Sequence, residues 1–259
     1  MNQTFEPRNV ERPFIGRWLR TSLQLLIRSP LHFGSVIVFL VCIDNAVAQL
    51  ATNYRIGAIW AHAVGSLLLG LVWVFVAALA RGADDASRTW SALLHVAKPR
   101  VWVGASTSAA VIVCIQIVFQ WALAGALRAH GHVFSGLIEH PGDLVSCMDV
   151  DAAFVSLFFD PFYFPLLALV PGIAAMDARS LSKHAAHKNG SVAIILGAGL
   201  IIVPPIMVAE VVPVFGLILA TTLTFLGVFN YVAYRDVFER RADNEPQRSG
   251  VLLPTPAER

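Results

Sequence analysis

The chain has 259 residues, of which 56% are hydrophobic and only 14% are charged, with a mean hydropathy of +0.66. A soluble domain carries about 25% charged residues, so this composition argues against a soluble globular protein. The net charge of +2 is small, and the basic residues flank apolar stretches, which argues against nucleic acid as a partner. Three cysteines are too few and too scattered for a disulfide framework.

The first predicted unit is an amphipathic helix followed by two apolar spans. Residues 13–28 have an apolar face and a basic face, the pattern of a helix that lies in the membrane interface. The apolar face comprises Ile15, Trp18, Leu19, Leu23 and Leu26, and the other face Arg17, Arg20, Gln24 and Arg28. The spans are residues 31–51 and 57–80, and each has the roughly 20 residues that a transmembrane helix needs.

Two further units repeat this order along the chain. Their amphipathic stretches are 84–98 and 178–188, and their spans are 101–127, 152–176, 191–209 and 213–234. The apolar stripe of the first stretch comprises Ala86, Trp90, Leu93, Leu94 and Ala97. Because the apolar residues run continuously and do not alternate, they predict helices and not the strands of a barrel. We therefore expect an all-α polytopic membrane protein with six transmembrane helices and amphipathic interfacial helices on the cytoplasmic side.

The distribution of basic residues predicts the orientation. Of the 19 Lys and Arg residues, only Arg55 and Arg128 fall in the first, third and fifth loops. Basic residues in short loops stay in the cytoplasm. Both termini are therefore expected there, in a multi-pass protein of the bacterial inner membrane.

Three segments follow from this topology. Residues 1–30 are a cytoplasmic tail with its interfacial helix, and residues 31–236 are the membrane domain. Residues 237–259 are polar and proline-containing, and we expect them to be disordered in the cytoplasm. One alternative concerns residues 1–48: the apolar run before Ala46-Val47-Ala48 has the form of a cleavable signal peptide, although the region ahead of it is long for one.

Polar residues inside the spans form a candidate intramembrane cluster. An ionisable residue in a span costs roughly 2.5–3.5 kcal/mol, so each one needs a reason. The candidates are Asp44, His62, Gln120, Asp160 and Glu210. With the predicted orientation, all of them lie toward the outer ends of their spans, near the level of Pro204-Pro205. The cytoplasmic halves of the spans are almost free of polar side chains.

Two interpretations of these residues stay open. They could line a polar cavity open to the periplasm, in which a carboxylate and His62 bind a cation or relay protons. Alternatively they could be hydrogen-bonding contacts between helices, worth about 0.6 kcal/mol each, or could reach the membrane interface.

Metal and catalytic signals are poor. The third loop, 128–151, contains three histidines and several acidic residues, but their spacing matches no zinc pattern. No phosphate-binding loop, metalloprotease motif or nucleophile elbow occurs, so we expect no enzyme and no identified cofactor.

Short motifs resemble an uncharacterised family of six-helix proteobacterial inner-membrane proteins. They are Trp18-Leu19-Arg20 with Pro30, then Pro171 with Ser180, Ala186 and Lys188-Asn189, and the exit 231–238 (YVAYRDVF). This family is distantly similar to the membrane domain attached to some glycerophosphodiester phosphodiesterases. The resemblance implies six helices and a cytoplasmic C-terminus, but no mechanism. Tyr234-Arg235-Asp236 also has a plain interpretation, with Asp236 pairing Arg240 one turn later.

Two functions of different classes are compatible with these features. The first is a membrane protein that binds or transports a small solute or ion through the periplasm-facing cavity. The second is an accessory or assembly subunit that packs against another membrane protein. The small-residue stretch Gly104–Ala110 suits close helix packing either within the bundle or with such a partner.

Overall fold

The computed structural model describes residues 6–10, 13–53, 58–85, 89–129, 161–194, 196–199, 201 and 215–239. Throughout these ranges the regular structure is helical, which confirms the all-α fold class. The long helices are α2 (Pro30–Asn53), α3 (Ala58–Asp84), α5 (Pro99–Ala129) and α10 (Phe215–Tyr234). The shorter ones are α1 (Phe14–Arg28), α4 (Thr89–Val96), α7 (Tyr163–Leu169) and α8 (Ala175–Lys188), and a π-helical turn, η2 (Arg235–Glu239), continues α10.

Four predicted spans coincide with the four long helices, whose ends lie within about four residues of the expected bounds. Judged by length and hydropathy over the described residues, one helix, Gly216–Glu239, is able to cross a membrane. A second qualifies if α1 and the start of α2 count as one bent span. Since 72% of the Gly216–Glu239 window is buried, a core helix of a soluble protein would pass the same test. One or two such helices are weak evidence for membrane association, and the six-span topology stays a prediction.

The fourth predicted span, 152–176, is wrong at its C-terminal end. Helix α7 ends at Leu169, and α8 begins separately at Ala175. Pro171 has no N–H with which to continue the helix, and Gly172 adopts a φ of +87°, which glycine tolerates best. Residues 152–160 lie outside the described part of the chain. In the fifth span, residues 191–194 and 196–199 are helical, and 202–209 lie outside it.

The predicted C-terminal boundary is also too early. The π-helical turn carries the ordered chain through Glu239, and Val237 is buried. The hydrophobic run ends at Tyr234, but Val237 and Phe238 supply another apolar pair that packs on the core. The predicted disordered tail from 237 therefore loses its first three residues, and residues 240–259 lie beyond the described ones.

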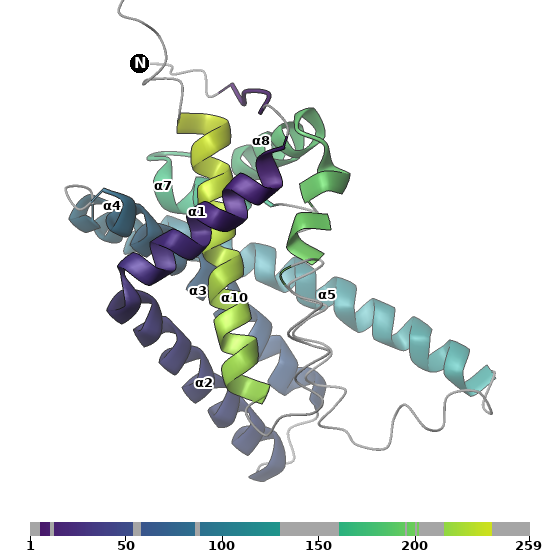
Figure 1. The fold of residues 1–259 in the computed structure, drawn as a ribbon. Helices are drawn as coiled ribbons and strands as arrows, with labels where there is room; N and C mark the ends of the chain where they lie inside the picture. The colour runs from purple at the N-terminus through teal and green to yellow at the C-terminus, as the bar shows by residue number, and fades with distance from the viewer. Residues whose placement is uncertain are drawn as a thin grey trace, which may run out of the picture.

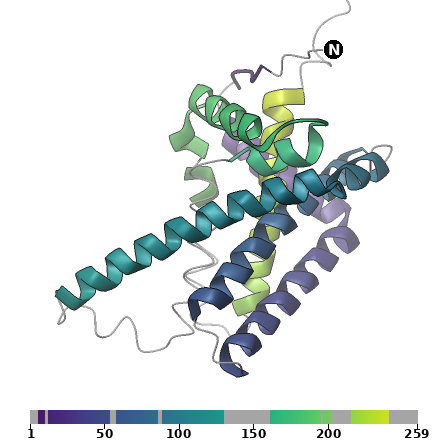
Figure 2. The ribbon, with the colours of Figure 1, turned by 180° about the vertical axis from the view of Figure 1, so that it is seen from behind.

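The helices are arranged around α10 and α3 (Figure 1). Helix α1 crosses α10, while α2 and α3 run beside it and α3 also packs against α4, α5 and α7. At one end of the molecule, here called the polar end, lie α1, α8 and the C-terminal end of α10. The C-terminal end of α2 and the first turn of α3 lie at the opposite end. The C-terminal half of α5 points away from the other long helices in both views (Figures 1 and 2).

Small residues allow the central helices to approach closely. A Cβ added at Gly227 would come 2.8 Å from Val76 Cγ1, and one at Gly70 would come 3.2 Å from Ala109 Cβ. Beside the first contact, the Trp73 indole donates a hydrogen bond of 3.2 Å to the Leu223 carbonyl. Such contacts suit helix packing in lipid, where close van der Waals contact replaces the hydrophobic driving force.

Two of the three predicted interfacial stretches, 13–28 and 84–98, differ in part from the prediction. In α1 the buried residues are Phe14, Trp18, Ser22 and Leu25, so the predicted apolar face is divided between an inner face and an exposed one. In α4 the buried residues are Ala92 and Val96, whereas Leu94 is 66% exposed and Ala97 is exposed too. Helix α4 is shorter than the predicted stretch 84–98, because the chain turns at Ala97–Lys98 and Ala97 lies outside the helix.

Candidate functional site

Three of the five predicted cluster residues lie in helices that the structure describes, and two do not. Asp44 lies in α2, His62 in α3 and Gln120 in α5, but only the backbone is described there. Asp160 and Glu210 lie outside the described residues. Helices α2 and α3 pack together, so Asp44 and His62 lie on neighbouring helices in the part remote from the polar end. The half of α5 that contains Gln120 points away from both helices, which separates it from the other two (Figure 2).

The predicted metal-binding loop is largely outside the described residues, since α5 continues to Ala129 and residues 130–151 are not described. Among the residues that are described, no group of three or more His, Cys, Asp or Glu side chains could hold a metal ion. Two cysteines, Cys42 and Cys114, are exposed free thiols.

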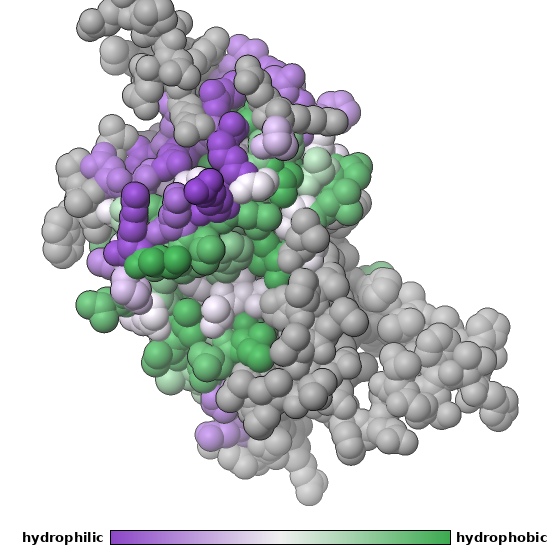
Figure 3. Space-filling view, viewed as in Figure 1, coloured by the Kyte–Doolittle hydropathy of each residue, from purple (hydrophilic) through white to green (hydrophobic). Residues whose placement is uncertain are grey.

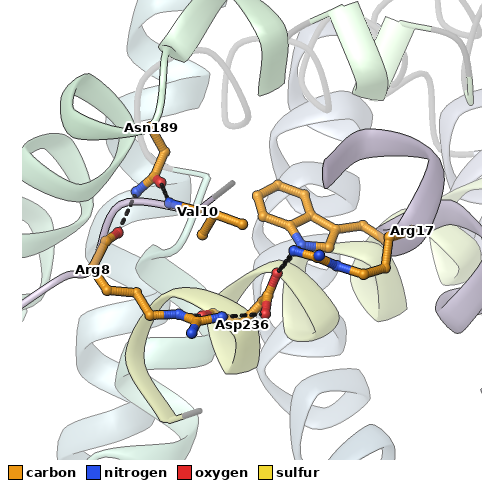
Figure 4. A network of polar contacts seen from close by, with 6 residues as sticks. Arg8, Val10, Arg17, Asn189 and Asp236 are labelled. Atoms are coloured by element: carbon orange, nitrogen blue, oxygen red, sulfur yellow. Dashed lines mark hydrogen bonds and ion pairs between the residues drawn. The ribbon is translucent and has the colours of Figure 1, made fainter. Parts of the chain in front are cut away.

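The best-defined polar site is centred on Asp236, at the polar end (Figure 4). This aspartate is 3% exposed and follows α10 in the π-helical turn. Arg8 Nη2 lies 2.5 Å from Asp236 Oδ1, and Arg17 Nη2 lies 2.7 Å from Oδ2. The Trp18 indole also donates to Oδ2, at 2.8 Å. We call these four residues the Asp236 cluster.

The electrostatics of the cluster favour an ionised aspartate. Burial alone would favour a neutral carboxyl group, but two guanidinium groups and an indole N–H compensate for it. Both arginines remain partly exposed, at 30% and 41% of their side chains, so only the carboxylate is fully removed from water. Loss of one partner from a buried pair costs about 3–5 kcal/mol, because the other charge is left uncompensated.

A strap formed by residues 6–10 completes the cluster. The Arg8 guanidinium donates to the Asp236 carbonyl as well as to its carboxylate, and the Arg8 N–H donates to the Val237 carbonyl at 3.1 Å. On the other side, Asn189 accepts from the Val10 N–H at 2.7 Å and donates to the Arg8 carbonyl at 3.0 Å. Since Asn189 is the C-cap of α8, the strap ties α8 to the end of α10.

A second set of ion pairs joins α3 to the end of α10. Arg235 Nη1 lies 2.5 Å from Asp84 Oδ2, and Tyr231 donates to the same carboxylate at 3.0 Å. Arg81 pairs with Glu239, which also accepts from the Tyr234 hydroxyl. The last turns of α10 are thus held by polar contacts on both sides.

The segment 234–236 is therefore more than a membrane anchor. The plain interpretation paired Asp236 with Arg240, a residue outside the described ones, whereas the described partners come from the start of the chain. Sequence reasoning missed this site because its partners are 218–228 positions apart. The available signal was an aspartate directly after an apolar span, in a chain whose N-terminal tail is rich in arginine.

The small-residue stretch of α5 packs within the bundle. Ala105, Ser108 and Ala109 are buried, and a Cβ at Gly104 would lie 3.1 Å from Leu167 Cδ1 of α7. The Tyr163 hydroxyl donates to the Gly104 carbonyl at 2.8 Å. This face of α5 is thus covered by α3 and α7, and is not free for another protein.

The chain matches no protein-family model, no curated protein and no solved structure. The geometry described above is therefore the basis for a functional proposal.

Proposed function

We propose that the chain is a multi-pass protein of the bacterial inner membrane with both termini in the cytoplasm. The cytoplasmic side would be the polar end, which carries α1, α8 and the end of α10. On the face seen in Figure 3, hydrophilic residues predominate at this end and a hydrophobic region lies below them. That division fits a bundle whose basic end stays out of the bilayer.

The angle between the first two helices supports this placement. Helices α1 and α2 meet at 94°. If α2 crosses the bilayer, α1 therefore lies parallel to the membrane surface, as an interfacial helix does. Large exposed apolar side chains on α2, such as Val38 at 63% and Phe39 at 55%, would then face lipid.

Within this placement we propose that the protein binds or transports a small solute or ion from the periplasmic side. The observation that carries the proposal is the position of Asp44 and His62 on two packed helices, away from the cross-linked polar end. Asp44 lies nine residues before the end of α2, and His62 four residues after the start of α3. Both positions therefore lie in the halves of α2 and α3 that are remote from the polar end.

Aqueous accessibility tests this role. Single cysteines, Asp44→Cys, His62→Cys and Asp160→Cys, are introduced after Cys42, Cys114 and Cys147 are replaced by serine. A membrane-impermeant thiol reagent is then applied to intact spheroplasts, with exposed Val38→Cys of α2 as the lipid-facing control. We expect labelling at 44, 62 and 160 but not at 38. Equal silence at all positions would contradict a wet periplasmic cavity.

The accessory-subunit alternative is favoured by one observation, a row of exposed apolar residues on α5. Val103 is 64% exposed, Val111 38% and Val118 68%. Lipid acyl chains could cover these residues as well as a partner protein could. The small residues of α5 already pack within the bundle. A stoichiometric partner that co-purifies with the wild type and is lost with Val103→Lys/Val111→Lys would favour the accessory role.

The orientation has its own test. A cysteine at the C-terminus, Arg259→Cys, in the same cysteine-free background should react with the impermeant reagent only after the membrane is opened with detergent. Labelling in intact spheroplasts would place this terminus outside and contradict the proposed topology.

A further inference from the structure

The outward surface of α1 carries basic and apolar side chains together. Arg20, Gln24 and Arg28 are exposed, as are Leu23 at 52% and Ile27 at 68%. The sequence has no acidic residue between positions 13 and 34. Within the described part of the chain, neither Arg20 nor Arg28 forms an ion pair. Positive charge on this surface is therefore not neutralised by neighbouring carboxylates.

The helix has three distinct sides. Phe14, Trp18 and Leu25 are buried on the side that packs against α10. Next to it, Leu19, Leu23 and Ile27 follow one another at four-residue steps and form an apolar side that is increasingly exposed toward the C-terminal end. Arg17, Arg20, Gln24 and Arg28 form the polar side. The fold also uses Arg17, which pairs with Asp236, and Leu19, which is partly buried against the core. Arg20, Leu23, Ile27 and Arg28 are left at the surface.

The polar side and the exposed apolar side of α1 lie at different levels along the direction from the polar end to the opposite end. In Figure 3 hydrophilic surface runs along the upper edge of the diagonal that α1 follows in Figure 1, and hydrophobic surface lies directly below it. The right angle between α1 and α2 aligns this boundary with the plane in which a bilayer surface would lie. The apolar side would thus face acyl chains and the basic side the headgroups.

We propose that this surface of α1 binds anionic phospholipids of the cytoplasmic leaflet. Arg20 and Arg28 contact the phosphate groups, and Leu23 and Ile27 enter the upper acyl region. Charge complementarity selects this occupant, because a basic side without carboxylates attracts an anionic surface and the adjoining apolar side adds buried area. The inference rests on the membrane placement proposed above and adds the class of lipid that the protein selects.

The test measures which lipids stay bound to the full chain. The protein is reconstituted in vesicles of equal phosphatidylcholine and phosphatidylglycerol, extracted in mild detergent, and its retained lipids are counted by mass spectrometry. The wild type should retain phosphatidylglycerol in excess. Arg20→Gln/Arg28→Gln should lower that excess, by about fivefold for each arginine at low salt. Arg20→Lys/Arg28→Lys should keep most of it, because the charge is preserved.

A control variant tests whether the effect is specific to α1. Lys183→Gln removes an exposed basic residue of α8 and should leave the lipid ratio unchanged. If the glutamine double variant retains phosphatidylglycerol as the wild type does, the lipid assignment is wrong and an acidic protein becomes the occupant to seek. A fall of equal size with Lys183→Gln would also overturn it, since the attraction would then be diffuse.

Carbonate extraction of the membranes separates this failure from failure of the proposed placement. A chain that alkaline carbonate releases is not integrally embedded, and the proposed function fails. A chain that stays embedded but shows no phosphatidylglycerol excess refutes only the present inference.

Discussion

Asp236 and Asp84 are two carboxylates at the same end of the molecule, but they differ in burial. The Asp236 side chain is 4% exposed, whereas that of Asp84 is 27% exposed and that of its partner Arg235 is 22% exposed. Water screens the second pair, so its contribution to stability is modest. The first pair is much more sensitive, because a buried charge depends on all of its partners.

Replacement of Asp236 by asparagine should therefore destabilise the protein strongly. Asp236→Asn keeps the shape of the side chain but removes the charge that Arg8, Arg17 and Trp18 bind, and we expect a loss of about 1.5–3 kcal/mol in the free energy of unfolding. Denaturant unfolding in detergent, followed by tryptophan fluorescence, measures it. The matched control Asp177→Asn changes an exposed aspartate in the first turn of α8 and should cost less than about 1 kcal/mol. Equal losses in the two variants would show that the cluster contributes little.

His95 should make stability depend on pH. Burial lowers the pKa of this half-buried imidazole below its usual value, and the positive charges of Lys98 and Arg100 lower it further. The hydrogen bond to the Leu167 carbonyl opposes this shift without reversing it. Below about pH 6.5 the unfolded chain takes up a proton that the folded chain resists, so stability falls as the pH drops through this value.

Melting temperatures at pH 5.5 and 7.5 test this dependence. The wild type should melt at a lower temperature at pH 5.5, and His95→Gln should reduce the difference, because glutamine can still donate to Leu167 but does not titrate. The exposed His184 of α8 provides the control, and His184→Gln should leave the difference unchanged. A pH effect of the same size in His95→Gln would assign it to other groups.

At the scale of the helices, sequence reasoning succeeded where one signal dominated. Continuous apolar runs bounded by polar residues predicted α2, α3, α5 and α10 to within a few residues. The end of the fourth span was predicted wrongly because Pro171 and Gly172 interrupt the helix there. The mean hydropathy of the run stays high across these two residues and does not reveal the interruption. In α1 the periodicity identified the helix, but it could not show which apolar residues face α10 and which stay exposed. That division depends on the neighbouring helix, and hydropathy carries no information about it.

Close helix packing predicts opposite effects on stability for two glycine-to-alanine substitutions. Gly227→Ala places a Cβ 2.8 Å from Val76 Cγ1 and 3.2 Å from Trp73 Cδ1, so α10 must shift from α3. We expect a loss of about 1–3 kcal/mol in unfolding free energy. Gly34→Ala in α2 meets no atom within 4 Å and should be neutral or stabilising by up to about 1 kcal/mol, because alanine favours the helix. Parallel denaturation curves check both, and a destabilised Gly34→Ala with an intact Gly227→Ala would contradict the described packing.

At the scale of the whole molecule, the start of the chain holds its C-terminal helix in place. The strap and α1 contribute Arg8, Arg17 and Trp18 to a carboxylate near the other end of the sequence. An aspartate directly after an apolar span and an arginine-rich N-terminal tail are visible in the sequence, but no local pattern pairs residues 218–228 positions apart. The candidate intramembrane cluster was predicted from the sequence. The described structure supports it only in that Asp44 and His62 lie on two helices that pack together. The separation of Gln120 depends on the divergence of α5, which the sequence did not indicate.

The strap predicts coupling between two residues on different helices. Asn189 holds the strap from α8 and Asp236 holds it from the end of α10, so either Asn189→Ala or Asp236→Asn should release it. Once the strap is free, the second substitution has fewer contacts left to remove. The double variant should therefore lose less unfolding free energy than the sum of the single variants, with a coupling of about 0.5–3 kcal/mol.

A second cycle shows whether this coupling is specific to the strap. Gly227 packs on Val76 and Trp73 and shares no described partner with Asn189, so Asn189→Ala and Gly227→Ala should be additive to within about 0.5 kcal/mol. If the strap pair is additive as well, α8 and α10 are stabilised independently. If both pairs are coupled, the whole bundle unfolds as one unit and the strap has no separate role. Coupling confined to the first pair would show that residues 6–10 join two helices of the polar end into one cooperative structure.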